Sequence, residues 1–231
     1  MAGKMYGIGV GPGDPELLTL KAVRLIRESA VVAVPGTAKE ESVAYRIVKQ
    51  AIPELDEKEI IPVPMPMTKD KTLLEQSHEA GARLISQQLD AGKDVAFLTL
   101  GDPTVYSTYL YIHKRIDAAG YDTEIISGIT SFCAVSAKLN TGLVEKAEPL
   151  HVIPASYQID EALKLPGTKV LMKAGKKMAH VKDVLKGMAD CEAMMIENCG
   201  MPDEKIYKSV DEINEKAGYY SLIIVKEKKA D

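Results

Sequence analysis

Cysteine is scarce in this chain of 231 residues. The cysteines that occur, Cys133, Cys191 and Cys199, are odd in number and include no Cys-x-x-Cys pair. Neither a disulfide framework nor a zinc site is therefore indicated. The histidines also lack the spacing of metal ligands, so we expect no protein-bound metal. A reducing cytoplasm is the compartment that this cysteine usage predicts.

Excess positive charge and long apolar runs are missing as well. The formal net charge is -4 at pH 7, whereas a nucleic-acid partner requires a basic face that neutralises phosphates. No apolar run approaches the roughly 18 residues needed to cross a bilayer, and the amino terminus lacks the apolar stretch of a signal peptide. We therefore expect neither a nucleic-acid nor a membrane partner. The length suffices for a real core, in one large domain or two small ones.

Several common catalytic motifs are absent too. The chain contains neither a Gly-x-x-x-x-Gly-Lys phosphate loop nor a Gly-x-Ser-x-Gly elbow. Its carboxylates are abundant, but the sequence pairs none of them as an acid and a base. Kinase, hydrolase and zinc-enzyme functions are thereby disfavoured. A reaction that depends on positioning, rather than on a nucleophilic side chain, remains attractive.

The most informative stretch runs from Asp94 to Tyr109. Residues 95–98 form a short apolar run that is typical of a strand buried on both faces. Gly101 ends this strand, and Asp102-Pro103 predicts a helix start. The apolar face of that helix is predicted to contain Val105, Tyr109, Ile112 and Ile116.

Ligands of open α/β sheets bind at the carboxyl ends of strands. Leu100, Gly101 and Asp102 follow the predicted strand directly, so they are expected to lie beside a small molecule. The alternative is an ordinary capped connection between a strand and a helix.

A glycine-rich turn follows the first predicted strand, residues 5–10. It reads Gly9-Val-Gly-Pro-Gly-Asp-Pro15 and matches the dinucleotide fingerprint in neither available register. Pro12 removes a backbone donor, and the carboxylate of Asp14 would repel phosphate. This disfavours a nicotinamide cofactor. It suggests a ligand with an adenosine-like body and no phosphate chain, such as S-adenosylmethionine (SAM); a plain tight turn is the alternative.

The remaining pattern predicts two α/β domains. In the first half, predicted strands alternate with predicted helices, which is typical of a mostly parallel sheet. In the second half, strands follow one another with little helix between them, which indicates a mixed sheet. We place the domains at residues 1–120 and 121–231. The further predicted strands are 30–34, 59–63, 122–126, 151–154, 168–173, 193–197, 204–210 and 219–227.

Taken together, the segments Gly7–Leu20, Gly101–Thr108 and Gly128–Ser131 resemble the tetrapyrrole (corrin/porphyrin) methylase family. Residues 66–70 and 97–109 are similar to the branch that methylates C20 of a corrin precursor, precorrin-2 or cobalt-factor II, in cobalamin biosynthesis. The resemblance implies the class III SAM methyltransferase fold, with two α/β domains and SAM in the cleft between them. It also implies a tetrapyrrole substrate, S-adenosyl-L-homocysteine (SAH) as product, and a homodimer.

The resemblance also assigns residues. It implies that Leu100, Gly101 and Asp102 hold the methionine part of SAM, and it assigns no residue a direct catalytic role. As a hypothesis about mechanism, Asp102 orients SAM through the amino group of the cofactor, by a charge-assisted contact, and a helix cap alone is the alternative. Many family members have Gly-Gly-Asp where this chain has Leu100-Gly101-Asp102, but Leu100 keeps the backbone carbonyl that a ligand would use. The implied cofactor contacts are Pro12, Leu100, Gly101, Asp102, Val105, Thr130, Ser131, Lys173, Ala174 and Cys199.

A substrate with many carboxylates predicts cationic side chains in its part of the site. The candidates are Lys69, Lys71, Lys176 and Lys177, and a plain surface position is the alternative for each. A sister methylase acting on another ring carbon, a protein methylase like diphthine synthase, and a SAM-binding module without activity are the alternative functions. Cobalt-containing and metal-free substrates are equally compatible with these residues.

Overall fold

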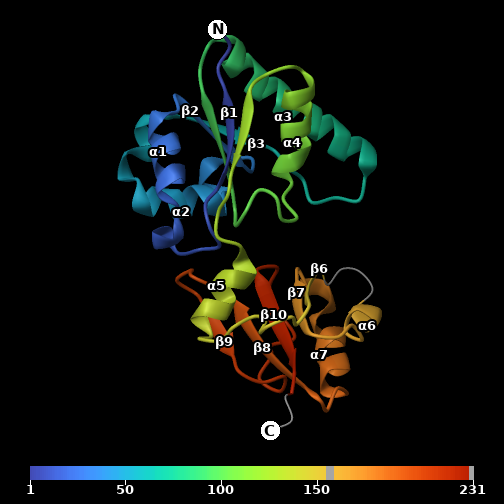
Figure 1. Ribbon diagram of the computed structural model, residues 1–231. Coiled ribbons are helices and arrows are strands. Elements are labelled where there is room, and N and C mark those ends of the chain that lie inside the picture. Colours follow the sequence, from blue (N-terminus) through green and yellow to red (C-terminus); the bar gives the residue numbers. More distant parts are fainter. Residues whose placement is uncertain (155–158, 229–231) are drawn as a thin grey trace. The chain divides into compact units, whose positions relative to one another are not determined.

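The computed structural model describes residues 1–154 and 159–228 of the chain (Figure 1). The chain divides into two compact units, Met1–Thr130 and Ser131–Asp231. The sequence analysis placed the boundary at residue 120. The division falls later because strand β5 (Thr123–Ile126) pairs in parallel with β1 (Met5–Gly9) and so completes the sheet of unit 1.

Unit 1 is built on a parallel sheet of five strands, in the order β3-β2-β4-β1-β5. All five residues of β4 are buried, as expected of a central strand covered on both faces. The other strands of this sheet are β2 (Val31–Pro35), β3 (Glu59–Val63) and β4 (Val95–Thr99).

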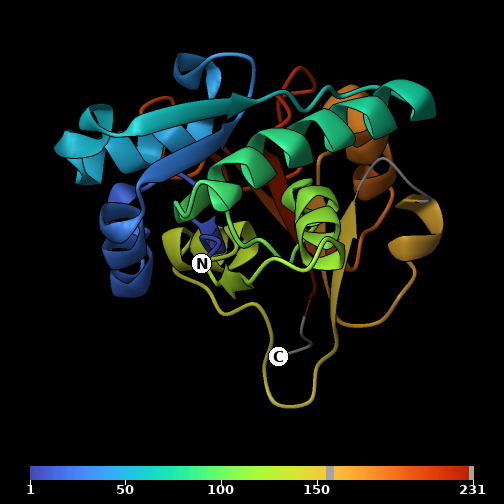
Figure 2. The same ribbon diagram turned by 90° about the horizontal axis from the view of Figure 1, so that it is seen from above.

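Helices cover both faces of this sheet (Figure 1). Helices α1 (Leu20–Glu28) and α2 (Val43–Ala51) bury Ile26 and Ile47 against Val32 and Leu98. Helices α3 (Lys71–Asp90) and α4 (Tyr109–Ala118) lie side by side on the other face, as both ribbon views show (Figures 1 and 2), and pack against Val31, Val95 and Phe97. Alternate residues of each strand thus supply two separate cores. Short 3-10 helices span Pro15–Leu17, Lys39–Glu41 and Pro53–Glu57.

Unit 2 contains a mixed sheet in the order β6-β7-β10-β8-β9. Only the pair β6–β7 is parallel among its described strand pairs, and the others are antiparallel. Helix α5 (Ser131–Lys138) covers one face through Val135, and α7 (Met178–Lys186) covers the other through Val181. The remaining elements are β6 (Leu150–Pro154), α6 (Ile159–Ala162), β7 (Thr168–Met172), a 3-10 helix (Gly175–Lys177), β8 (Cys191–Glu197), β9 (Lys205–Tyr207) and β10 (Ser221–Glu227).

Helix α4 begins later than the sequence predicts. The expected start at Asp102-Pro103 is wrong, because residues 103–108 form a turn and the helix begins at Tyr109. Val105 therefore lies in this turn and not on the helix. Tyr109, Ile112 and Ile116 are fully buried, as predicted. A Cβ atom on Gly7 would lie 2.0 Å from the Tyr109 ring, so strand β1 needs a glycine there to admit that ring.

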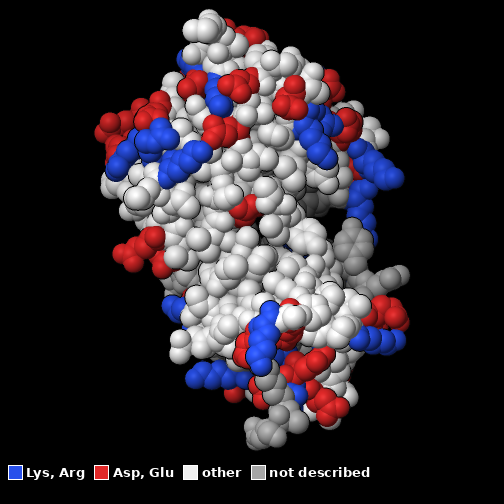
Figure 3. Space-filling model, viewed as in Figure 1, with Lys and Arg blue, Asp and Glu red and all other residues white. Residues whose placement is uncertain are grey.

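On the face shown in Figure 3, charged side chains gather in groups that contain both signs. One network on unit 1 joins α2 to the 3-10 helix at 53–57. Asp56 accepts hydrogen bonds from Lys49 (2.5 Å), from the Tyr45 hydroxyl and from Lys39 (2.9 Å). These donors hold the pKa of the Asp56 carboxyl well below its usual range.

Asp56→Asn is therefore expected to lower the free energy of unfolding at neutral pH. A carboxyl group with a depressed folded-state pKa stabilises the protein above its unfolded pKa of about 4, and this contribution is lost as the pH falls through the lower folded value. In urea titrations, the stability difference between wild type and variant should shrink below about pH 4. Glu28→Gln, in the exposed Arg24–Glu28 pair, is the matched control and should change stability little. A difference that grows in acid would contradict this account.

Candidate functional site

Three turns meet at the carboxyl edge of the sheet in unit 1. Strand β1 lies between β4 and β5, and all three are parallel, so their carboxyl ends share one edge. The turns are residues 10–14 after β1, 100–108 after β4 and 127–130 after β5. The motifs that the sequence analysis singled out therefore come together in space.

Glycines allow these turns to touch through their backbones. Gly11 and Gly101 exchange two hydrogen bonds, of 3.3 and 2.8 Å, and both have positive φ values, +76° and +71°. A Cβ atom on Gly9 would lie 2.6 Å from the Gly101 oxygen, and one on Gly128 would lie 2.2 Å from the same atom. Larger residues at these positions would push the turns apart. At Gly101 itself a Cβ atom would meet nothing within 4 Å, so open space faces this backbone.

Asp102 joins the turn after β4 to the turn after β5. Its Oδ1 accepts hydrogen bonds from the Thr104 amide (2.8 Å) and hydroxyl (2.5 Å), and its Oδ2 accepts one from the Gly128 amide (3.0 Å). The residue is only 7% exposed. The sequence analysis expected Asp102 to cap the helix that follows. In the structure Asp102 does not cap α4 and instead fixes the spacing of two turns. The Gly128 contact is not predictable from sequence, since it joins residues 26 positions apart.

The structure brings six of the expected cofactor residues to this edge of unit 1. They are Pro12, Leu100, Gly101, Asp102, Val105 and Thr130. Pro12 is buried, whereas Leu100, Val105 and Thr130 are half-buried. Ser131 is the first residue of α5 and so belongs to unit 2.

The other expected cofactor residues lie along one edge of the sheet in unit 2. Strands β7 and β8 are both antiparallel to β10, so they point the same way and end at the same edge. Lys173 and Ala174 follow β7, and Cys199 follows β8. Lys173 and Asn198 have positive φ values, +59° and +55°, which are uncommon for residues other than glycine. Backbone strain of this kind is frequent at ligand sites.

Two tyrosines that the sequence analysis missed lie between these turns. Tyr219 and Tyr220 precede β10. The Lys173 ammonium lies 5.7 Å from the ring centre of Tyr219, and the backbone N–H of Asn198 donates to the backbone carbonyl oxygen of Tyr220 (3.0 Å). The sequence feature from which these two residues could have been predicted is a pair of adjacent tyrosines directly before an apolar strand.

The buried carboxylate of Glu197 holds the segment that precedes these tyrosines. It accepts from the Gly218 amide (2.7 Å) and the Tyr207 hydroxyl (3.3 Å). Burial, together with this carboxylate, raises the pKa of Tyr207, so its hydroxyl stays protonated and donates at neutral pH.

The lysines proposed for substrate binding are divided between the two units. Lys69 and Lys71 are exposed just before and at the start of α3 in unit 1. Lys177 is exposed in unit 2, and the side chain of Lys176 lies outside the described part of the structure.

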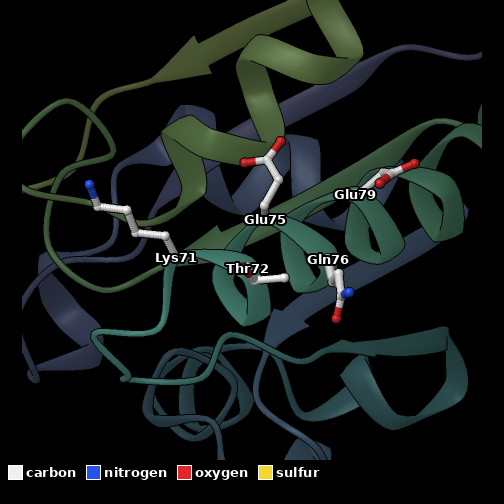
Figure 4. A pocket seen from close by; sticks show the side chains of 5 residues that line it. All are labelled: Lys71, Thr72, Glu75, Gln76 and Glu79. Carbon is white, nitrogen blue, oxygen red and sulfur yellow. The ribbon is translucent and has the colours of Figure 1, made fainter.

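Lys71 also borders an open pocket of about 430 Å³ on α3, together with Thr72, Glu75, Gln76 and Glu79 (Figure 4). In this view the Lys71 side chain points away from Glu75 and Glu79. Two carboxylates in the lining make this pocket a poor site for a substrate that is itself rich in carboxylates.

Within residues 1–154 and 159–228, no group of three or more His, Cys, Asp or Glu side chains is arranged to hold a metal ion. No helix of these ranges is long and apolar enough to cross a bilayer.

Comparisons with known proteins identify related sequences. The family model of the tetrapyrrole (corrin/porphyrin) methylases matches residues 4–213. The chain is 36% identical over 227 residues to a probable cobalt-precorrin-2 C(20)-methyltransferase of Methanocaldococcus jannaschii, with 96% of each chain covered. It is 31% identical over 233 residues to the cobalt-precorrin-2 C(20)-methyltransferase of Salmonella typhimurium, with 97% of each chain covered.

Solved structures share the fold. The uroporphyrin-III C-methyltransferase of Thermus thermophilus, complexed with S-adenosylhomocysteine, has a TM-score of 0.71 at 24% identity, with 97% of this chain and 98% of that chain covered. A cobalt precorrin-4 methyltransferase has a TM-score of 0.73 at 20% identity, with 96% and 94% covered. These likenesses establish the fold, two α/β units with one parallel and one mixed sheet.

Gly128→Ala is expected to disrupt the contact between the turns. The added methyl group would clash with the Gly101 carbonyl, and such overpacking costs about 1–3 kcal/mol of stability. Thermal unfolding and SAH titration calorimetry should show a lower Tm and a lost or greatly weakened binding signal. Gly142→Ala, where a Cβ atom would meet only one atom at 3.8 Å, is the control. Wild-type SAH affinity in Gly128→Ala would show that the turn spacing is unimportant.

Asp102→Asn tests the bridge between the turns. An asparagine keeps one acceptor oxygen, so either the Thr104 amide or the Gly128 amide would face an NH2 group, at a cost of about 1–3 kcal/mol. We expect a lower Tm and a roughly tenfold or greater loss of SAH affinity, as 1.4 kcal/mol corresponds to a factor of ten. A variant that keeps both values would show that neither the stability of the protein nor SAH binding depends on the Asp102 carboxylate.

Proposed function

The chain belongs to the tetrapyrrole (corrin/porphyrin) methylase family, and we propose that it methylates C20 of precorrin-2 or its cobalt form, with SAM as methyl donor, in cobalamin biosynthesis. The observation that carries this proposal is the identity of 31–36%, over nearly the whole length, with the two C20-methyltransferase relatives. Membership of the family supplies the cofactor class and the tetrapyrrole substrate class.

The turns of unit 1 fit the methionine end of SAM. Gly101 presents its backbone to open space, while Gly9 and Gly128 are packed tightly behind it. A ligand can therefore approach the Leu100 carbonyl and the Gly101 backbone without meeting a side chain. We assign Leu100, Gly101, Asp102 and Val105 to this part of the cofactor, with Pro12 and Thr130 beside them. The remaining contacts, Ser131, Lys173, Ala174 and Cys199, come from unit 2.

Asp102 keeps one acceptor position for the cofactor. An ionised carboxylate offers about four lone-pair sites. The amide and hydroxyl of Thr104 and the amide of Gly128 occupy three of them, which leaves one on Oδ2. We assign this site to the amino group of SAM, through a charge-assisted hydrogen bond. The same contacts that fix the turns thus orient the carboxylate toward its ligand.

Methyl transfer from SAM requires little of this chain beyond alignment of the methyl group with C20. When bound, SAM supplies a methyl group that is already activated by its sulfonium centre. The residues of the site must hold that group in line with C20 and exclude water, and orientation alone contributes on the order of 7–11 kcal/mol in favourable cases. We assign no nucleophile and no residue as acceptor of the C20 proton. We also propose a homodimer in the cytoplasm, which the family resemblance and the cysteine usage support.

The proposed activity is tested by mass spectrometry. Purified protein and SAM are incubated without oxygen with cobalt-factor II and, in parallel, with metal-free precorrin-2. We expect one added methyl group on at least one of them, located at C20 by NMR of the product. Methylation of the cobalt compound alone would favour an early-cobalt route, and the reverse a late-cobalt route. A methyl group on another ring carbon, or none on either compound, would contradict the proposal.

A further inference from the structure

Glu197, the last residue of β8, carries a buried carboxylate that joins distant parts of unit 2. The residue is only 8% exposed. Its Oε1 accepts a hydrogen bond from the amide of Gly218, 21 positions along the chain (2.7 Å), and its Oε2 accepts one from the hydroxyl of Tyr207 on β9 (3.3 Å). Burial of an ionised carboxylate costs free energy unless hydrogen bonds replace the lost water. The segments that these hydrogen bonds hold therefore indicate what the residue is for.

Gly218 is held at both of its backbone polar groups. Glu197 binds its N–H group, and the buried hydroxyl of Ser221 donates to its carbonyl oxygen (2.8 Å). These two contacts fix the backbone directly before β10. The side chains of the intervening residues, Tyr219 and Tyr220, are nevertheless 44% and 42% exposed. A rigid backbone thus supports side chains that lie at the surface of unit 2.

The segment 218–220 lies between the two turns of unit 2 that we assign to the cofactor. Strand β10 pairs with β7 on one side and β8 on the other, so the residues before β10 meet the turns after both strands. The Lys173 ammonium approaches the ring of Tyr219 from the turn after β7. The backbone N–H of Asn198 donates to the carbonyl oxygen of Tyr220 from the turn after β8. A displacement of the segment would therefore disturb both turns.

Unit 1 contains a similar arrangement. Asp102 is 7% exposed and accepts a hydrogen bond from the amide of Gly128, which holds the turn after β5 beside the turn after β4. In each unit, a buried carboxylate near the carboxyl end of a strand thus binds the amide of a glycine in a distant segment. In each unit, residues that we assign to SAM flank that contact.

We propose that Glu197 is a positioning residue for SAM, which acts through Gly218 to hold the segment 218–220 and the two cofactor turns of unit 2 in place. This inference rests on the proposed function, because the assignment of those turns to SAM belongs to it. Glu197 acts through the backbone and does not touch the ligand. The role therefore requires an acceptor oxygen toward Gly218, but it does not require a negative charge.

The test compares Glu197→Gln and Glu197→Leu in the full chain. Glutamine keeps an acceptor oxygen for the Gly218 amide and can donate to the Tyr207 hydroxyl oxygen, whereas leucine occupies similar space without an acceptor. The Kd of SAH is measured by calorimetry, well below the Tm of each variant. Leucine should raise this Kd at least tenfold, as expected when a hydrogen bond to a charged group is lost. Glutamine should keep the Kd within about threefold of the wild type.

Thr168→Val is the matched control for stability. Thr168 is buried at the opposite end of β7 from Lys173, and its hydroxyl donates to the Leu143 carbonyl oxygen (2.7 Å). Valine has the same shape without the hydroxyl, so this variant should have a lower Tm and an SAH Kd within about twofold of the wild type. In assays with the tetrapyrrole that the wild type methylates, Glu197→Leu should raise the KM of SAM and leave the KM of the tetrapyrrole within about twofold.

The other outcomes overturn the inference. Wild-type SAH affinity in Glu197→Leu would show that the segment does not position the cofactor, and an equal loss in Thr168→Val would reduce the effect to one of general stability. An equal loss in Glu197→Gln and Glu197→Leu would show that the charge itself acts on the ligand. A tetrapyrrole KM that rises as much as the KM of SAM would assign the segment to the substrate.

The comparison also separates this inference from the proposed function. SAH binding is measured without any tetrapyrrole. A wild-type protein that binds SAH but methylates neither tetrapyrrole would therefore refute the proposed substrate, while the Kd values of the variants still decide the role of Glu197. A wild-type protein that does not bind SAH would refute the role of Glu197 together with the cofactor assignment.

Discussion

The close approach of three backbone turns is the constraint on which the site depends. Strand order places β1 between β4 and β5, so the turns that follow these strands must share a small volume. Only residues without a side chain allow the backbone at Gly9 and Gly128 to lie so close to the Gly101 carbonyl. The buried carboxylate of Asp102 then locks the turns after β4 and β5 together. The shape of this edge of unit 1 is therefore set mainly by backbone geometry, and the cofactor recognition that we propose for it would involve few side chains.

Much of the fold follows from local patterns in the sequence. Apolar runs locate the strands, because fully buried parallel strands such as β4 need continuous hydrophobic residues. The family motifs place Pro12, Gly101 and Asp102 at strand ends, where the structure has them. The resemblance to the methylases and the two-sheet architecture are confirmed by the family match and by the solved structures.

The features that escaped prediction depend on contacts between distant residues. Asp102-Pro103 has the local chemistry of a helix start, and the Asp102 carboxylate does accept from the Thr104 amide. Only a turn follows, however, the second carboxylate oxygen accepts from the distant Gly128, and α4 begins at Tyr109. Similarly, 122–126 could not be assigned to a unit until its pairing with β1 was known. In unit 2, Glu197 secures the segment before Tyr219 through Gly218, a contact between residues 21 positions apart. Propensity and spacing carry no information about such partners.

The position of β10 has a consequence for the order of folding during synthesis. All strands of the sheet in unit 1 lie within residues 5–126, so this sheet can form while later residues are still being added. In unit 2, β10 lies between β7 and β8 in the sheet and pairs with both of them, although it follows both in the sequence. Until residues 221–227 have left the ribosome, β7 and β8 expose unpaired backbone and apolar faces. On the ribosome, unit 2 is consequently the part of the chain most in need of protection from aggregation.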